Sequence, residues 1–337
     1  MTLVVFDADV LGRQRTGDET YVENLLRELA PIATEAGLRL AAVTRRPELV
    51  PTGIEPVTLA ARSQEWRMAW SLPRLLRRLR PALGHFQHAL PRACPCPAVV
   101  TVHDLSFERR PELMPLADRL TFRYAVRRAA RNAACLLAVS ERTRHDLTEL
   151  YGVPPERVVV TPNGVDPAFA PGGEPDAYAL FVGAIQRRKD PLAAAGAVRD
   201  AGLRLIVAGP RKDERLAREL AAAGADVRGY VAKDELARLY RGAACLVLPT
   251  RYEGFALPVL EAMASGTPVV ATPDAAVREV AGDAAVYAEA DGLAGAVRTA
   301  VAERARLVPL GLERARAFTW AETARRTLDV YLRVLGR

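Results

Sequence analysis

Residues 250–266 read Thr-Arg-Tyr-Glu-Gly-Phe-Ala-Leu-Pro-Val-Leu-Glu-Ala-Met-Ala-Ser-Gly, and this stretch decides the fold. It follows the apolar run 245–248, which predicts a buried strand of a parallel sheet. Pro258 suits the first turn of a helix, and Gly266 suits the left-handed position just past the helix end. Residues 267–272 then start the next strand. We therefore predict a strand, a loop, a helix and a strand, as in an α/β fold.

The corner between this strand and this helix carries groups that suit a nucleotide sugar. It lies at the carboxyl edge of the predicted sheet, where α/β folds bind ligands. Glu253 and Glu261 bracket it, and a carboxylate accepts two hydroxyl hydrogen bonds, as a sugar or ribose diol requires. An anion could bind to the backbone N–H groups of Gly254, Phe255, Ala256 and Leu257. The dipole of the helix would favour the negative charge there. On this pattern alone, a helix with acidic residues near its positive end remains an equal alternative.

The same residues carry a resemblance to a known family. Glu253 and Glu261, within E-G-F-A-L-P-V-L-E-A-M-A-S-G-T-P-V-V, resemble the E-x7-E region of family 4 retaining glycosyltransferases. The resemblance implies the GT-B fold, an α/β architecture of two Rossmann-like domains facing across a cleft. It also implies that Glu261 holds the donor ribose, and that Glu253 and the following backbone lie at the donor sugar and phosphates.

Length and composition are those of a globular protein. The chain has 337 residues, enough for two domains, and 26% of them are charged. The net charge of +7 is spread among acidic residues without aromatic–basic interleaving, so we expect no nucleic-acid partner. No apolar stretch reaches the ~20 residues that span a membrane, and the first residues enter a strand without a charged leader. We therefore expect a cytoplasmic protein, or one at the inner face of a membrane.

The four cysteines predict neither a metal site nor a structural disulfide. Cys94 and Cys96 stand too close together for the usual zinc knuckle, and no further ligand lies near them in the sequence. Cys135 and Cys245 lie in apolar runs that are typical of core thiols. We expect no cofactor beyond a nucleotide-diphosphate sugar that serves as donor substrate.

The alternation of strands and helices divides at the Pro- and Gly-rich stretch 167–175, which we interpret as a linker. We predict a first Rossmann-like domain over 1–168, which binds the acceptor, and a second over 176–319, which binds the nucleotide sugar. The last helix, 320–337, resembles the family's terminal helix, which crosses back to pack on the first domain.

In the first domain, His103 is the main candidate. It ends the predicted strand 98–102, and V-V-T-V-H-D-L-S-F resembles the family's His-Asp segment. This implies that His103 faces the donor sugar, while Asp104 either orients the imidazole or caps the next turn. Gly17, in a polar loop predicted over 13–20, matches the family's glycine-rich loop only in part.

A second feature of the first domain is a predicted amphipathic helix over 66–80, which alternates Trp66 and four leucines with five arginines, Arg67 among them. We favour a solvated basic face over the core. The alternative is a surface for an anionic membrane or a lipid-linked acceptor.

The second domain begins with a strand that ends at Gly183. Lys189 follows at a helix entrance, where a lysine suits a diphosphate. The family usually has a basic residue directly after this glycine; here Ala184 stands there, and either Arg187 or Arg188 is expected to supply the charge. Further along, Tyr230 and Val231 resemble the family's base-binding corner.

Together with the family resemblance, these features predict a metal-independent, retaining glycosyltransferase that moves a hexose from a GDP- or UDP-linked sugar. The H-D-L, R-K-D and G-F-A-L-P-V-L-E motifs look most like those of bacterial mannosyl- and rhamnosyltransferases of polysaccharide assembly, a resemblance that favours GDP-mannose. The expected catalytic residues are His103, Glu253 and Lys189. The acceptor is a glycan, a glycolipid or a small molecule, which the sequence does not identify. The alternatives are another GT-B nucleotide-sugar enzyme, such as an epimerase, and a non-catalytic nucleotide-sugar binder.

Overall fold

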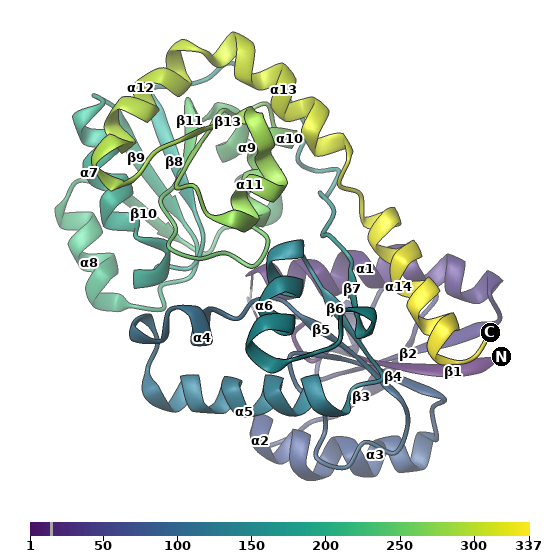
Figure 1. Ribbon diagram of the computed structural model, residues 1–337. Coiled ribbons are helices and arrows are strands. Elements are labelled where there is room, and N and C mark those ends of the chain that lie inside the picture. Colours follow the sequence, from purple (N-terminus) through teal and green to yellow (C-terminus); the bar gives the residue numbers. More distant parts are fainter. Residues whose placement is uncertain (14–15) are drawn as a thin grey trace. The chain divides into compact units, whose positions relative to one another are not determined.

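The computed structural model describes residues 1–13 and 16–337 (Figure 1). Its contacts divide the chain into two compact units, which we call unit 1 (1–164 and 320–337) and unit 2 (165–319). Both termini belong to unit 1. Among the described residues, every helix is too short or too polar to cross a membrane.

The described part of unit 1 is built around a parallel sheet of seven strands in the order β3-β2-β1-β4-β5-β6-β7. The strands are β1 (Thr2–Asp7), β2 (Leu38–Thr44), β3 (Glu55–Thr58), β4 (Leu83–Gln87), β5 (Ala98–Val102), β6 (Cys135–Ala138) and β7 (Val158–Val160). The helices are α1 (Thr16–Glu35), α2 (Gln64–Trp66), α3 (Leu72–Leu79), α4 (Ser106–Arg109), α5 (Leu116–Asn132), α6 (Glu141–Tyr151) and α14 (Trp320–Val334).

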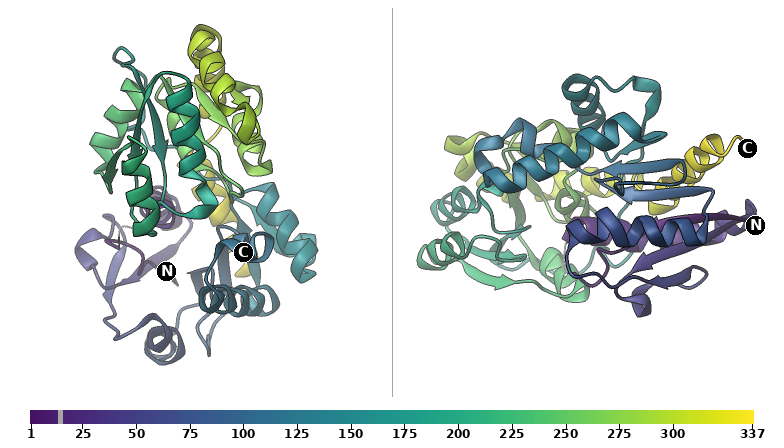
Figure 2. Two further views of the ribbon diagram at one scale, coloured as in Figure 1. Left: turned by 90° about the vertical axis from the view of Figure 1, so that its left-hand side faces the viewer. Right: turned by 90° about the horizontal axis from the view of Figure 1, so that it is seen from below.

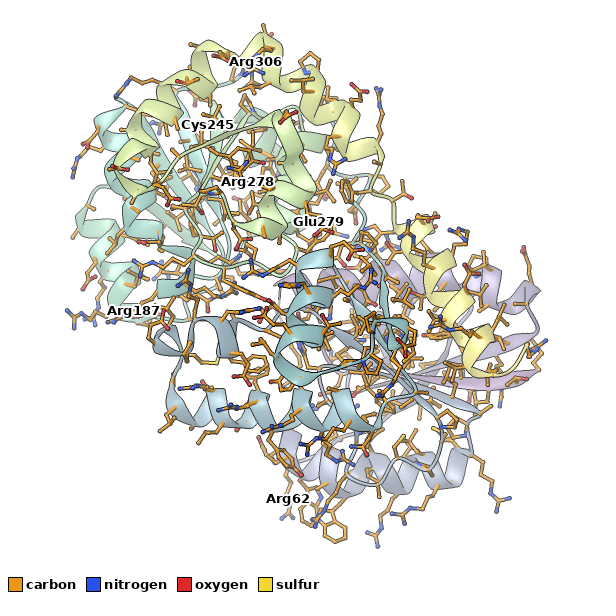
Figure 3. The ribbon with its side chains drawn as sticks, viewed as in Figure 1. Arg62, Arg187, Cys245, Arg278, Glu279 and Arg306 are labelled. Carbon is orange, nitrogen blue, oxygen red and sulfur yellow. The ribbon has the colours of Figure 1, made fainter. Side chains whose placement is uncertain are left out.

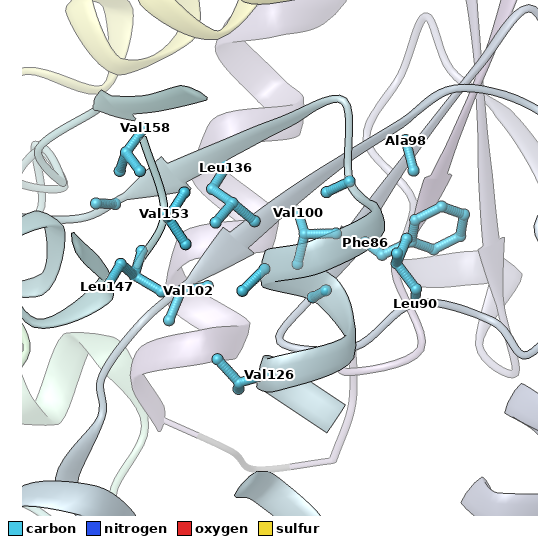
Figure 4. Packing of buried hydrophobic residues seen from close by; sticks show 14 of the residues in the cluster. Phe86, Leu90, Ala98, Val100, Val102, Val126, Leu136, Leu147, Val153 and Val158 are labelled. Carbon is cyan, nitrogen blue, oxygen red and sulfur yellow. The ribbon is translucent and has the colours of Figure 1, made fainter. Parts of the chain in front are cut away.

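Helices cover both faces of this sheet (Figures 1 and 2). On one face, apolar residues of α3, α5 and α6 pack against the central strands; Figure 4 shows Val126 and Leu147 beside Val100 and Val102. On the other face α1 lies against α14. Helix α14 is tied to the sheet by Tyr331, whose hydroxyl lies 2.5 Å from Nδ1 of His85. The return of the last helix to the first sheet thus agrees with the prediction.

Three sequence predictions for unit 1 need correction. Strand β4 was not predicted, although it lies between β1 and β5. Helix α1 starts at Thr16, so Gly17 lies in its first turn rather than in a loop; residues 14–15 of that expected loop lie outside the described residues. The predicted helix 66–80 is interrupted by a π-helical turn over 67–71.

The π-helical turn changes which residues face the core. Arg67, which we placed on the solvated face, is fully buried, and its Nη2 donates to Oδ1 of Asp7 at 2.6 Å. Trp66, which we placed on the apolar side, is 54% exposed. A wider turn inserts one residue into the helical repeat, so the face presented by the preceding residues rotates.

The described part of unit 2 is a second parallel sheet, with six strands in the order β10-β9-β8-β11-β12-β13. Its strands are β8 (Tyr178–Val182), β9 (Arg204–Ala208), β10 (Asp226–Gly229), β11 (Cys245–Leu248), β12 (Val269–Ala271) and β13 (Ala285–Tyr287). Its helices are α7 (Pro191–Asp200), α8 (Glu214–Ala222), α9 (Lys233–Gly242), α10 (Leu257–Ala264), α11 (Ala275–Ala281), α12 (Leu293–Ala302) and α13 (Arg304–Arg316).

The segment expected to hold the linker packs within unit 2. The ring of Phe169 meets that of Tyr240 edge-on, with centroids 5.6 Å apart, and Asp166 pairs with Lys233 at 2.7 Å. Gly266 has φ of 72°, which confirms the predicted left-handed end of α10.

Candidate active site

The candidate donor site lies in unit 2, where the strand order reverses. The chain leaves β8 towards β9 on one side, while β11 lies on the other side. Such a switch point is where open α/β sheets bind ligands, at the carboxyl ends of the strands. The sheet order brings four predicted segments to this edge: Gly183 after β8, the 187–189 turn that follows it, Tyr230 with Val231 after β10, and 250–257 after β11.

Two glycines pack backbone against backbone at this edge. A Cβ atom on Gly209 would lie 2.1 Å from the carbonyl oxygen of Gly183, so only glycine fits there. Both residues also have φ near 145°, which favours glycine. Gly209 was not singled out from the sequence, because its requirement comes from a neighbour 26 positions away (209 − 183).

Two cations and one carboxylate meet at the switch point. Nζ of Lys189 donates to Oε1 of Glu253, and both side chains are buried. Nη1 of Arg188 lies 3.8 Å from Oε2 of the same carboxylate and donates to the carbonyl of Tyr252 at 2.5 Å. The cluster therefore carries one net positive charge.

The two expected arginines differ in where their side chains lie. Arg188 turns inward to the β11–α10 loop, and its carbonyl accepts from the N–H of Arg251 at 2.9 Å. Arg187 is exposed, and Figure 3 shows it at the margin of unit 2. Arg188 is thus the arginine that lies with Lys189.

Helix α10 begins directly after this cluster. Ala256 holds φ of 74°, a left-handed conformation that is costly for a residue with a Cβ, and Pro258 lies in the first turn. The first N–H groups of a helix have no carbonyl partner inside it, which suits them to an anion. In α10, Pro258 has no N–H and that of Val259 donates to the carbonyl of Ala256 at 3.0 Å, so we expect an anion to meet the N–H of Leu257. Phe255 is buried, with its ring centroid 5.8 Å from that of Phe318.

Glu261 lies on α10 and is held by a tyrosine. The hydroxyl of Tyr240 donates to Oε2 of Glu261 at 2.8 Å, and the side chains of both residues are buried. Burial raises the pKa of Glu261 to about 7. The bond to Tyr240 occupies one carboxylate oxygen and leaves Oε1 to face another hydroxyl. At the β10 end of the same edge, Tyr230 is half-exposed.

In unit 1, His103 follows β5 directly. Its Nε2 donates to the side-chain oxygen of Gln87 at 2.8 Å, and Tyr21 meets the imidazole edge-on with centroids 4.7 Å apart. Burial lowers the pKa of His103 to about 4, so the ring is neutral near pH 7. Asp104 accepts from the N–H and the hydroxyl of Ser106 at 3.0 and 2.8 Å, so it caps the next turn.

Two residues beside His103 were not found from the sequence. His88 follows β4, and its ring centroid lies 4.9 Å from that of His103. Asp18, in the first turn of α1, has Oδ2 3.8 Å from Nε2 of His88. The sequence signal that could have pointed to His88 is that His88 and His103 are two of only four histidines in the chain. Strand β4 had to be recognised, however, before His88 could be placed beside His103. Gly17 precedes Asp18 in the same turn.

The family models match both halves of the chain. The model "Glycosyltransferase Family 4" matches residues 15–169, and "Glycosyl transferases group 1" matches residues 176–303. The chain belongs to the family 4 glycosyltransferases.

Curated relatives of this glycosyltransferase agree with that assignment. The O-antigen chain mannosyltransferase B of Escherichia coli is 28% identical over 266 residues, which cover 69% of this chain and 70% of that protein. An MMP alpha-(1->4)-mannosyltransferase of Mycolicibacterium hassiacum is 31% identical, covering 72% and 66%. A D-inositol 3-phosphate glycosyltransferase of Kineococcus radiotolerans is 34% identical, and this chain spans only 57% of its length.

Solved structures share the GT-B fold of this glycosyltransferase. A sucrose-phosphate synthase from Thermosynechococcus elongatus superimposes with a TM-score of 0.77 at 18% identity, and all of both chains is covered. The Anabaena protein HepE, crystallised with UDP and glucose, gives a TM-score of 0.75 at 15% identity, covering 98% of this chain and 99% of its own.

Proposed function

We propose that this glycosyltransferase moves a hexose from a nucleotide-diphosphate sugar to an acceptor with retention of configuration, and that it needs no metal ion to do so. The observation that supports this most is the cluster of Arg188, Lys189 and Glu253 at the start of α10. It joins two cations to a helix N-terminus at a switch point, which is an arrangement suited to a diphosphate.

In this proposal the donor diphosphate lies on the N–H groups of residues 254–257, with Lys189 and Arg188 beside it. These groups stabilise the negative charge that grows as the sugar–phosphate bond breaks. They take the place that Mg²⁺ holds in other phosphate chemistry. Because Lys189 is held by Glu253, its ammonium is fixed before the donor arrives, and little reorganisation is needed in the transition state.

The remaining donor contacts follow from the same edge. Oε1 of Glu261 would accept from a ribose hydroxyl, and the backbone at Tyr230 and Val231 would meet the base. Gly183, next to Gly209, lets the backbone approach the donor closely. Gly17 would approach the phosphates and the acceptor from unit 1.

For the chemical step we propose attack on the face from which the leaving group departs, with the leaving phosphate taking the acceptor's proton. Glu253 is an unsuitable nucleophile because its Oε1 accepts from Lys189 and Arg188 lies near Oε2. A two-carboxylate glycosidase mechanism is therefore not proposed. Because the Nε2–H of neutral His103 already donates to Gln87, its Nδ1 would accept from a hydroxyl of the donor sugar, a role that requires no change of charge.

GDP-mannose is the donor we favour, with a UDP-hexose next. Two of the relatives above are mannosyltransferases by name, and HepE was crystallised with UDP and glucose. The acceptor would be a glycan, a glycolipid or a small molecule.

The first experiment is a binding titration of the purified chain with GDP, UDP, ADP and NAD, with Glu261→Ala in parallel. We expect one diphosphate to bind tightly and the variant to lose this binding. Binding of none, or binding indifferent to Glu261, would contradict the donor site. Epimerisation or hydrolysis of the donor without acceptor would favour another GT-B enzyme. Binding without turnover on any acceptor would favour a sensor.

We also propose peripheral association with an anionic membrane through unit 1. Trp66 and Trp70 are about half-exposed, ahead of the arginines of α3. On α5, Leu116, Leu120 and Tyr124 recur every four residues and are all more than half-exposed, so they form one apolar ridge beside Arg123 and Arg127. Exposed aromatic and apolar residues beside cations are typical of a membrane interface.

Pelleting with liposomes that contain anionic lipid tests this association. We expect salt-sensitive pelleting that Leu120→Ser and Trp70→Ser both weaken. Leu192→Ser is the matched control, because Leu192 is an exposed leucine of unit 2, on α7. Equal recovery of all variants with neutral and anionic liposomes would argue against membrane association.

A further inference from the structure

The residues Asp18, His88 and His103, which we call the histidine cluster, bring one ligand atom each to within 4.8 Å of one another. They come from three separate elements of unit 1: the first turn of α1, the end of β4 and the end of β5. Two imidazoles and a carboxylate form the ligand set that is typical of zinc sites with an open coordination position.

The spacing in the cluster suits a shared cation better than a hydrogen bond. Nε2 of His88 and Oδ2 of Asp18 are 3.8 Å apart, beyond hydrogen-bond length. Two ligand atoms that each lie about 2.1 Å from a tetrahedral Zn²⁺ are roughly 3.4 Å apart. Small rotations of Asp18 and His88 would bring them to that separation.

The surrounding contacts orient the two imidazoles. Nε2 of His103 donates to the side-chain oxygen of Gln87, which leaves Nδ1 of that ring to face another partner. Ligand histidines usually donate their other N–H to an oxygen in this way. His88 has a backbone φ of 57°, a strained conformation for histidine. Its backbone N–H donates to the carbonyl of Thr101 at 2.8 Å. The strain places its ring beside His103.

We propose that the histidine cluster binds a divalent transition-metal ion of the Zn²⁺ class. This departs from the expectation of no metal site. Mixed imidazole and carboxylate ligands favour such ions over Mg²⁺ and Ca²⁺, which prefer oxygen alone. The ion is not needed to bind the donor. Because it occupies His103, which would contact the donor sugar, it inhibits sugar transfer, and this last consequence rests on the function proposed above.

The test is a direct titration of the full chain, stripped with a chelator, with Zn²⁺ in competition with a chromophoric zinc indicator. We expect one equivalent to bind. His88→Gln should weaken binding by more than about 100-fold, since loss of even an outer-shell partner costs roughly 10–100-fold. Co²⁺ should give visible absorption bands in the wild type that are absent from His88→Gln.

His145→Gln is the matched control. His145 is exposed on α6, with Nε2 3.1 Å from a carboxylate oxygen of Glu149. Among the residues that the structure describes, this histidine–carboxylate pair has no third ligand. We expect its zinc affinity to equal that of the wild type. Asp18→Asn gives a second variant if His88→Gln fails to fold, as judged by circular dichroism.

The proposal is overturned if the wild type binds no stoichiometric Zn²⁺, or if binding persists in both His88→Gln and Asp18→Asn. Inhibition of sugar transfer by Zn²⁺, reversed by chelator, is a separate readout. If no transfer occurs on any acceptor, the proposed function fails while the zinc titration still decides the metal site.

Discussion

Each unit has a buried cation–carboxylate pair at the carboxyl end of its first strand. In unit 1, Asp7 ends β1 and pairs with Arg67; in unit 2, Lys189 follows β8 and pairs with Glu253. Both strands lie where their sheet's order reverses, so the two pairs occupy equivalent positions.

The two pairs differ in the charge that they leave accessible. The Arg67 side chain is 0% exposed and lies between Asp7 and Asp9. Asp9 also pairs with Arg45 and Arg13, whose side chains are 31% and 29% exposed. In unit 2, Lys189 and Arg188 outnumber Glu253, and their side chains remain 10% and 16% exposed. The guanidinium of Arg67 is closed off from any ligand and is suited to holding the fold, while the cations paired with Glu253 remain at the surface of a ligand edge. We therefore expect the same position to serve stability in unit 1 and, in the function proposed above, anion binding in unit 2.

The strongest test of this contrast is Arg67→Met, which leaves Asp7 buried without its partner. Breaking a buried pair from one side costs about 3–5 kcal/mol, so we expect unit 1 to lose most of its stability. Denaturant unfolding of the full chain measures it. Arg74→Met on α3 is the matched control, because Arg74 is exposed. The double variant Arg67→Met/Asp7→Asn should recover part of the loss. A stability change no larger than that of Arg74→Met would contradict the structural role.

The corresponding change in unit 2 should affect turnover more than folding. In the function proposed above, Lys189→Ala removes a cation that acts on the growing phosphate charge, and removal of one such preorganised group costs roughly 10²–10³ in kcat. Lys212→Ala is the matched control, because Lys212 is an exposed lysine of the same unit. Steady-state kinetics with the donor identified by titration measures both. Near-wild-type turnover of Lys189→Ala would show that another group supplies the charge.

These two pairs also show what the sequence made predictable. The corner from β11 to α10 was predicted because its signals are local: a strand, two carboxylates, a proline and a terminal glycine within 22 residues (245–266). Lys189 was found because a lysine is rare in this chain and stands at a helix entrance. Fold and family followed from the same short motifs.

Features that depend on distant partners were missed. Strand β4 has His85 at a fully buried position, and a buried histidine looks unfavourable until its partners, Thr101 and Tyr331, are known. Arg67 was assigned to the solvent because Asp7 is 60 positions away and the π-helical turn was not foreseen. His88 and Asp18 were missed for the same reason.

Glu261→Gln tests whether the buried carboxylate that is proposed to bind the donor lowers the stability of unit 2. The pKa of Glu261 is raised from 4.5 to about 7 by burial. Between these values the folded state binds more protons than the unfolded state, so the stability of the wild type falls as pH rises from about 4.5 to 7. At about 1.4 kcal/mol per pKa unit, Gln should gain up to roughly 3 kcal/mol at pH 8, and nothing at pH 4.

Thermal unfolding of wild type and Glu261→Gln across this pH range measures the effect, with Glu289→Gln, an exposed glutamate of the same unit, as control. If the stability gain of Glu261→Gln does not vary with pH, then Glu261 does not take up a proton on folding. In the same variant, diphosphate affinity should fall although stability rises.

The smallest expected effect is that of Tyr240→Phe. This variant keeps the carboxylate of Glu261 but removes the hydroxyl that positions it. The Tyr240 hydroxyl stabilises the ionised form, so its removal raises the pKa of Glu261 further. In the function proposed above, ionised Glu261 is the form that accepts from both hydroxyls of a ribose diol. Donor affinity should therefore rise with pH in both proteins, and the rise should occur at a higher pH in the variant. At neutral pH, the variant should lose about 1.5–3 kcal/mol of donor-binding free energy, the value of a hydrogen bond to a charged group. Titrations of nucleoside diphosphate at several pH values measure it. If the variant binds more weakly by the same factor at every pH, then Tyr240 acts through packing, and the charge state of Glu261 does not govern how unit 2 takes its donor.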